Sequence, residues 1–234
     1  MIMANKLIRF QRHYIAFNFH SVFFSLSIKL TVLLSFSSNI SAQDFIYLKN
    51  DSVLWTPSAK LHFAANSIAK LNAKHQVVFG FLNEERFLWT KYRLIKFKAG
   101  SEIQFDDEGN VRSGVLAENM NLRTPAGFVN FKAGRQVQFD DNGNVISGFL
   151  LRNTWLKNGE NEILFKEGSY IQFDEQGNII EGRLAQKHHL ECTDGKARNF
   201  KNGEIIYFNK EHKVIYQEKK KNKGKPKENK PNKE

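Results

Sequence analysis

Hydrophobic and polar residues alternate with a period of two along most of the chain, which is typical of β-strands with one buried and one exposed face. In the stretch IKFKAGSEIQFD (residues 95–106), apolar side chains occupy every second position on both sides of the short segment AGS. This pattern predicts two strands joined by a turn across Lys98–Ser101. Because no long segment has the 3.6-residue periodicity of a helix, we expect an all-β fold.

The same line of sequence returns every 34 residues. QFDDEGNVRSGVL at residues 104–116 becomes QFDDNGNVISGFL at 138–150 and QFDEQGNIIEGRL at 172–184. Four sets of residues keep this period, with one extra residue between Leu190 and Phe200. They are Phe63, Phe97, Phe131, Phe165 and Phe200; Leu48, Leu82, Leu116, Leu150 and Leu184; Leu54, Leu88, Leu122, Leu156 and Leu190; and Gly80, Gly114, Gly148 and Gly182. Such a period indicates a repeat architecture in which each copy packs on its neighbours.

The copies begin near residues 63, 97, 131, 165 and 200 and predict one β-repeat domain over residues 43–217. Two architectures fit: about five β-hairpin repeats in an elongated antiparallel meander, or a parallel β-solenoid. The tight turns favour the meander, because parallel neighbours need long crossovers. The parity of the apolar residues changes between Val115 and Leu116, so we also expect a β-bulge near Gly114.

Each well-preserved copy contains an acidic turn. Asp tolerates turn geometry and accepts hydrogen bonds from nearby backbone N–H groups, and Gly accepts a positive φ. The residues concerned are Asp106, Gly109, Asp140, Gly143, Asp174 and Gly177. Clustered carboxylates also suit Ca²⁺, but neither the EF-hand spacing nor the repeat GGxGxDxUx is present. We therefore interpret these segments as structural hairpin turns.

The element F-x-x-G-x-x-x-x-F-D-x-x-G-N-V-x-x-G-x-L resembles the hairpin repeats of exported bacterial proteins related to the MORN-repeat and YwqK antitoxin-like families. The resemblance covers roughly residues 63–217 and lies in the order of turn, glycine and strand. The 34-residue unit is longer than a MORN unit and lacks its aromatic-glycine signature. The resemblance implies a hairpin array used for interaction, without a family-wide active site.

The net charge of +11 lies at the two ends of the chain. Residues 1–42 carry four basic and no acidic side chains, and residues 218–234 carry eight Lys and three Glu. Removing both ends from the totals of 35 basic and 24 acidic residues leaves 23 and 21 for residues 43–217. The repeat domain is therefore nearly neutral, which argues against specific nucleic-acid binding.

Both ends have a distinctive composition. Residues 1–42 place basic residues before the apolar run VFFSLSIKLTVLLSF and the small polar stretch SSNISA, which is the order of a signal peptide. Cleavage after Ala42 predicts an exported protein in the periplasm, the outer envelope or the medium; an uncleaved membrane anchor is the alternative. Residues 218–234 have no apolar side chain and are expected to be disordered. Their lysines either solubilise the chain or tether it weakly to an anionic surface.

Two groups of residues are candidates for binding chemistry. His188, His189 and Cys192 in KHHLEC are residue types that ligate transition metals, and they lie next to the inserted residue. We favour a solvated or partly buried loop for this segment, with a metal site as the alternative. The aromatic residues Trp55, Trp89, Trp155 and Tyr92 flank the leucine positions of the repeat. These aromatics either stack on sugars or anchor a protein partner, or they cover the dry face of a strand; we favour a core position slightly.

Repetition argues against catalysis, because an enzyme needs one asymmetric site whereas repeated units build an extended surface. We therefore expect an exported, non-enzymatic protein, without a cofactor, that binds or scaffolds a protein or polymer of the cell envelope. A secreted carbohydrate- or metal-binding module is the second hypothesis. A hydrolase that uses Cys192 with a neighbouring histidine is the third.

Overall fold

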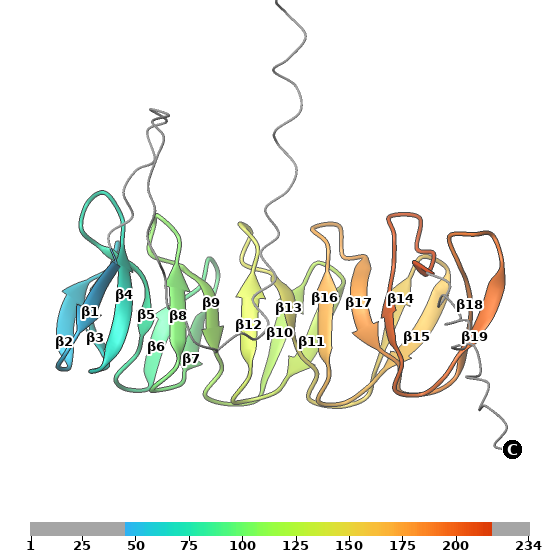
Figure 1. Cartoon of the computed structure of the whole chain (residues 1–234), viewed down its shortest axis with the longest axis horizontal. Helices are drawn as coiled ribbons and strands as arrows, with labels where there is room; N and C mark the ends of the chain where they lie inside the picture. Colours follow the sequence, from blue (N-terminus) through green and yellow to red (C-terminus); the bar gives the residue numbers. More distant parts are fainter. Residues whose placement is uncertain (1–44, 217–234) are drawn as a thin grey trace, which may run out of the picture. The chain divides into compact units, whose positions relative to one another are not determined.

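The computed structural model describes residues 45–216, which form twenty β-strands and no helix (Figure 1). The prediction of an all-β fold is confirmed. The segments predicted as signal peptide and lysine-rich tail, residues 1–42 and 218–234, lie outside the described residues. Since the described part contains no helix, it contains none that is long and apolar enough to cross a membrane.

Ten strands form one large antiparallel sheet. Each strand pairs with the next one across the sheet, and every pairing is antiparallel, so the meander is confirmed and the parallel solenoid is not formed. In spatial order the strands are β1 (Phe45–Leu48), β4 (Ser67–Leu71), β5 (Val77–Phe81), β8 (Glu102–Phe105), β9 (Val111–Val115), β12 (Gln136–Phe139), β13 (Val145–Phe149), β16 (Tyr170–Phe173), β17 (Ile179–Arg183) and β20 (Ile205–Tyr207).

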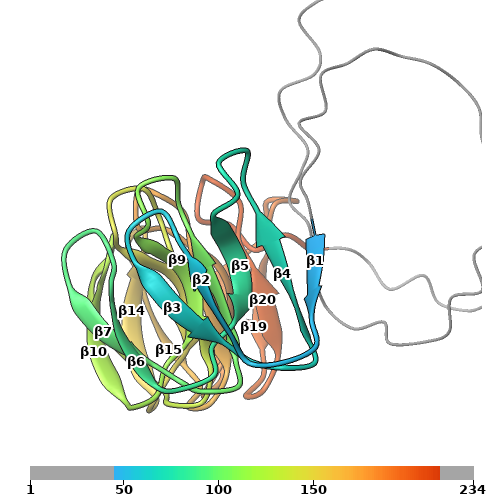
Figure 2. The same ribbon diagram turned by 90° about the vertical axis from the view of Figure 1, so that its left-hand side faces the viewer.

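The other ten strands form five separate hairpins, which we call the hairpin layer. Figure 2 looks along the array and shows the hairpins on one side and the large sheet on the other. Hairpins 1 to 5 are β2 (Ser52–Trp55) with β3 (Lys60–Phe63), β6 (Arg86–Trp89) with β7 (Leu94–Phe97), β10 (Met120–Thr124) with β11 (Gly127–Phe131), β14 (Thr154–Asn158) with β15 (Asn161–Phe165), and β18 (His188–Glu191) with β19 (Ala197–Phe200). A copy of the repeat therefore supplies two strands to the sheet and one hairpin to the second layer.

The connection at Lys98–Ser101 is a passage between layers and not the predicted hairpin turn. Strand β7 before it pairs with β6, whereas β8 after it pairs with β5 and β9. The Gly100 N–H donates to the Leu82 carbonyl (2.7 Å), and Phe97 forms an isolated bridge with Leu116. These contacts fix the chain at the edge where the two layers meet. The alternation of residues was predicted correctly, but the partners of the two strands were not.

The space between the layers is filled by repeated apolar side chains. Phe63, Phe97, Phe131 and Phe165 are completely buried, and the leucines that pair with them, Leu82, Leu116, Leu150 and Leu184, are at most 1% exposed. Each phenylalanine lies at the end of a hairpin and each leucine directly after a strand of the large sheet. The close-packed phenylalanine of each copy gives the array one continuous core. Since the chain has a single cysteine and therefore no internal disulfide, this packing holds the copies together.

The expected bulge is present but lies closer to the acidic turn than Gly114. Gln104 pairs with Ser113 and Phe105 pairs with Val111, so Arg112 is the extra residue. Gly114 itself pairs regularly with Ile103. A Cβ at Gly114 would lie 2.6 Å from the ring of Phe97. This glycine is therefore needed for the close approach of the phenylalanine and not for the bulge.

Both terminal copies use a variant of the acidic turn. Asn72 and Asn209 stand where the middle copies have Asp, and His75 and His212 stand where they have Gly. The two histidines have φ values of 56° and 62°, in the left-handed region that glycine favours. After the last turn the chain folds back, and Val214 becomes buried beside Cys192. This returning segment covers the last copy, as the end of a repeat array requires.

Candidate functional site

The three predicted metal ligands His188, His189 and Cys192 do not form one site. His188 and His189 are consecutive residues of β18, so their side chains point to opposite faces of the hairpin. Cys192 is fully buried. Among residues 45–216, no group of three or more His, Cys, Asp or Glu side chains is arranged to hold a metal ion.

Cys192 occupies a structural position of the repeat. The hairpin loops begin at Thr56, Thr90, Thr124, Asn158 and Cys192, all of them buried. In each of the first four loops, the two residues whose backbones pair to close the loop span four positions, as Thr90 and Arg93 do. In the fifth loop the closing residues, Cys192 and Lys196, span five. The inserted residue of the sequence therefore lengthens the fifth hairpin loop, and Cys192 fills the place of a buried loop residue.

The longer fifth loop is closed by a surface ion pair. Arg198 donates two hydrogen bonds to the Asp194 carboxylate, each 2.6 Å long, and lies 3.9 Å from the ring of Tyr216. The guanidinium lowers the pKa of Asp194 to about 2. Since Asp194 is exposed and Arg198 only partly covered, the role of the pair is to order the loop and the returning chain more than to stabilise the fold.

His188 joins hairpins 4 and 5. Its Nε2 accepts a hydrogen bond from the Leu164 N–H (3.1 Å), and its ring packs edge-on against Trp155. Accepting this bond requires the neutral imidazole with the proton on Nδ1. Burial lowers the pKa of His188 below the ordinary value of 6.5. Both observations mean that the folded chain disfavours protonation of this histidine.

Acidification is therefore expected to destabilise the contact between hairpins 4 and 5. Between the lowered pKa of folded His188 and about 6.5 in the unfolded chain, the unfolded state binds more protons, so stability falls as the pH falls through this window. Comparing melting temperatures at about pH 7.5 and about pH 5 for wild type and His188→Gln measures the effect. The drop should be smaller in His188→Gln and unchanged in the control His189→Gln; equal drops in all three proteins would contradict the assignment.

The acidic turns use their carboxylates internally. In the third turn, Asp140 Oδ1 accepts from the N–H groups of Asn142 and Asn144, and Oδ2 accepts from the Asn144 side-chain amide. Asp106 and Asp174 make the same three bonds in their own turns. The glycines of the three turns have φ values of 86°, 72° and 90° for Gly109, Gly143 and Gly177. The three aspartate side chains therefore act within their own turns.

Replacing Asp140 by alanine should lower the free energy of unfolding by about 1–3 kcal/mol, because three partly buried donors lose their acceptor. Asp140→Asn should cost less, since Asn72 Oδ1 accepts the corresponding N–H bonds of Lys74 and Gln76 in the first turn. Denaturant unfolding of both variants measures the difference. Equal losses for the two substitutions would show that the side-chain oxygen does not hold the turn.

The three predicted tryptophans lie on the outer face of the hairpin layer and Tyr92 lies in the exposed loop of hairpin 2, so the expectation of a core position was wrong. Trp55, Trp89, Trp155 and Tyr92 are 58%, 61%, 54% and 64% exposed. These three tryptophans are the only ones in the sequence. Their leucine neighbours Leu54, Leu88 and Leu156 point inward and pack against the core, so each tryptophan points to solvent.

Sequence reasoning missed three further members of this face: Phe87, Leu94 and Phe128. Phe87 and Phe128 pair across their hairpins with Lys96 and Arg123. The alternation of residues along each strand predicts their exposure, since each of the three residues is adjacent to an inward residue of its strand. We call Trp55, Phe87, Trp89, Tyr92, Leu94, Phe128 and Trp155 together the aromatic face.

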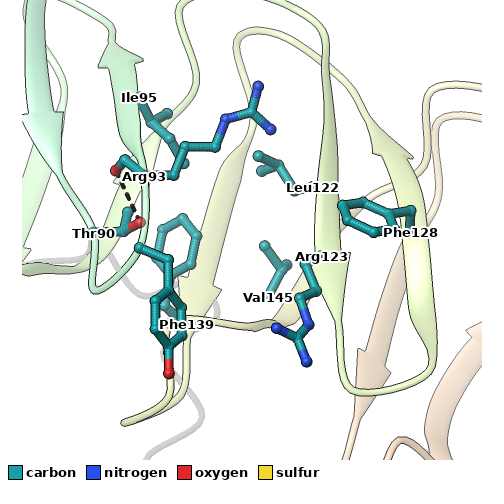
Figure 3. Close-up of a pocket in the computed structure, with 10 residues that line it drawn as sticks. Thr90, Arg93, Ile95, Leu122, Arg123, Phe128, Phe139 and Val145 are labelled. Atoms are coloured by element: carbon teal, nitrogen blue, oxygen red, sulfur yellow. Dashed lines mark hydrogen bonds between the residues drawn. The ribbon is translucent and has the colours of Figure 1, made fainter.

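A pocket of about 220 Å³ opens between hairpins 2 and 3 (Figure 3). Its floor is formed by the buried side chains of Ile95, Leu122, Phe139 and Val145, which come from both hairpins and from the large sheet. The loop of hairpin 2 also lies close to the acidic turn that begins at Asp140, two copies further along the chain. A Cβ at Gly143 would lie 2.6 Å from the Cβ of Lys91. The pocket is thus bounded by three segments that the repeat brings together.

The rim of the pocket carries two arginines and two aromatic residues. Arg93 and Tyr92 come from hairpin 2, and Arg123 and Phe128 come from hairpin 3. Arg93 donates a hydrogen bond to the Asn121 carbonyl (2.9 Å). Within the described residues, neither arginine has an acidic side chain within 4.0 Å. Two positive charges therefore border an apolar cavity without an internal counter-ion.

The outer face of the large sheet is different in character. Its central row contains Gln104, Ser113, Gln138, Ser147 and Gln172, paired across neighbouring strands. The Ser147 hydroxyl donates to the Gln138 side chain (2.9 Å). These polar groups are satisfied partly by one another. The end strands of the same face expose Phe45, Tyr47 and Tyr207, so the two outer faces of the domain differ in the centre of the array and not at its ends.

The comparison with known proteins does not assign the chain. No protein-family model matches it, and no curated protein matches it significantly. The resemblance to MORN-like and YwqK-type repeats therefore stays a prediction.

Proposed function

We propose that the chain is an exported, non-enzymatic binding protein of the cell envelope and that the aromatic face is its binding surface. The observation that carries this proposal is the exposure of all three tryptophans on one face of a rigid array. Exposed aromatic residues are costly in water and are typical of protein and ligand interfaces. Hairpins 1, 2 and 4 each present one of these tryptophans to a large partner.

The geometry gives little support to catalysis. The thiol of Cys192 is buried against the Leu190 carbonyl, and His188 Nε2 is engaged by the backbone of Leu164. A cysteine nucleophile needs an accessible thiol and a base free to accept its proton. Repeated side chains that serve the same structural purpose in each copy suit a binding surface better than an asymmetric active site.

Export is supported by the sequence of residues 1–42. Basic residues precede an apolar run and a small polar stretch, as in a secretory signal. Intact-mass analysis after fractionation of the producing cells tests this part of the proposal. A mature chain that begins at Gln43 in the periplasm or medium would support export, and a full-length chain in the cytosol would overturn it.

Co-sedimentation of the purified protein with envelopes of the producing cells tests the binding surface. We expect a salt-resistant component that depends on Trp55 and Trp89, and a salt-sensitive component that disappears when residues 219–234 are deleted. The matched control is the double variant Gln104→Ala and Gln138→Ala on the opposite face. If this control loses as much binding as the double variant Trp55→Ala and Trp89→Ala, the aromatic face is not the binding surface.

The same assay distinguishes the two classes of ligand. Protease treatment of the envelopes should abolish the salt-resistant component if the partner is a protein. Periodate oxidation should abolish it if the tryptophans stack on sugars, which is the carbohydrate-binding alternative.

A further inference from the structure

We infer that the pocket between hairpins 2 and 3 receives an apolar side chain of a partner protein and that Arg93 and Arg123 bind carboxylates beside it. This inference rests on the proposed binding function and specifies the chemistry of the partner: an acidic segment with an aromatic or large aliphatic anchor. It follows from the size, the lining, the charge and the position of the pocket.

The size of the pocket fits one side chain. A volume of about 220 Å³ accommodates roughly seven groups of the size of a water molecule, which corresponds to one aromatic ring or one branched aliphatic side chain. Its floor consists of apolar side chains, Ile95, Leu122, Phe139 and Val145 (Figure 3). A pocket of these dimensions is smaller than a typical small-molecule site but suits the central anchor of a protein interface.

The charge of the rim selects an acidic partner. Arg93 and Arg123 extend from neighbouring hairpins around the pocket, and no carboxylate of the described residues neutralises them. The nearest acidic turn is already engaged, since Asp140 accepts bonds within its turn and Asp141 pairs with Arg112. Guanidinium groups bind carboxylates bidentately and stay charged at all physiological pH values.

Only the junction between hairpins 2 and 3 has arginine at both of these repeat positions. One period earlier, Ala59 and Trp89 stand at the positions of Arg93 and Arg123, and one period later Gly127 and Lys157 stand there. The aromatic residues Tyr92 and Phe128 are replaced at the earlier junction by Ser58 and Leu94. The copies are thus alike in their core and different at this point of the surface, which is expected where one copy has acquired a binding role.

The composition of the surroundings agrees with a protein interface. Trp, Tyr and Arg are the residue types most enriched among residues that dominate binding energies. Here Tyr92, Arg93 and Arg123 border the pocket, and Trp89 directly precedes its lining residue Thr90. An extended partner segment anchored in the pocket would continue over the exposed aromatic residues of hairpin 2.

A blocked peptide with the sequence Glu-Asp-Phe-Asp-Glu is a direct probe of the full-length protein. We expect binding that weakens with salt, with backbone amide shifts in the NMR spectrum centred on Thr90, Leu122 and Val145. Replacing the phenylalanine of the peptide by alanine, or its acidic residues by lysine, should abolish binding. Arg123→Glu should weaken binding roughly tenfold.

Lys157→Glu is the matched control, because Lys157 is exposed and occupies the position of Arg123 one period later. It should bind the acidic peptide as the wild type does. Equal weakening in both variants, or equal binding of the acidic and the lysine peptide, would overturn the inference. Binding of phenylacetate without binding of the peptide would also overturn it, in favour of a small anion. Tryptophan-dependent binding to envelopes would then still stand, so the two proposals fail separately.

Discussion

Replacing Phe131 by alanine is expected to lower the free energy of unfolding by about 3–5 kcal/mol. Phe131 is completely buried at the end of β11, where it bridges to Leu150 of the large sheet and lies against Gly148. Removing the ring takes away apolar burial and leaves a cavity at the point where the two layers are joined. Chemical denaturation monitored by circular dichroism measures the loss.

Phe128 on the same strand is the internal control. It is 70% exposed, three residues away from Phe131, and points outward. Phe128→Ala should change stability by no more than about 0.5 kcal/mol, as is usual for surface substitutions. Similar losses for the two phenylalanines would show that the strand does not have the inward and outward faces described above.

The second large effect is expected from Gly148→Ala, which should destabilise the fold by about 1–3 kcal/mol. A Cβ at this position would lie 2.6 Å from Cδ1 and 2.8 Å from Cε1 of Phe131. Both partners belong to regular strands and neither has room to withdraw, since Phe131 is fully buried. The glycine is therefore required by the ring and not by its own backbone conformation.

A double-mutant cycle tests this assignment. Phe131→Leu shortens the side chain that the new methyl group would meet, so Gly148→Ala should cost less in the Phe131→Leu background than in the wild type. The difference between the two costs is the coupling energy of the pair. Additive effects of the two substitutions would contradict a direct conflict between the methyl group and the ring.

Much of the fold follows from the sequence because the repeat applies the same constraint several times. The alternation around Ile95 and Phe97 predicts strands with one dry face, and the 34-residue period predicts copies that stack. The turns at Asp106, Asp140 and Asp174 are predicted by local chemistry, since the side chain accepts bonds from its own turn. Each of these inferences depends on residues close together in the chain.

The pairing of strands was harder to predict, because it depends on residues that are distant in the sequence. The short connection at Lys98–Ser101 reads as a hairpin turn, yet β8 finds its partners in β5 and β9. A passage between two layers and a tight turn need similar residue types. The choice between them is made by the burial of Phe97 against Leu116 of the large sheet.

The candidate site was predicted only in part for the same reason. Hydrophobicity alone favours a core position for Trp89, whereas its adjacency to the inward Leu88 predicts the exposed position that the structure has. Arg93 and Arg123 lie thirty positions apart in the sequence, and only the packing of hairpins 2 and 3 brings them to one pocket. The metal site considered for KHHLEC is not formed, because consecutive strand residues such as His188 and His189 cannot converge on one ion.

The central claim, that the aromatic face of the hairpin layer is the surface that binds, is tested most directly by photo-crosslinking in the producing cells. A photo-reactive phenylalanine analogue is placed at position 89 on this face and, in a second variant, at position 138 on the outer face of the large sheet. We expect a discrete cross-linked species from position 89 and none from position 138. Cross-linking from position 138 alone, or from neither position, would contradict the account.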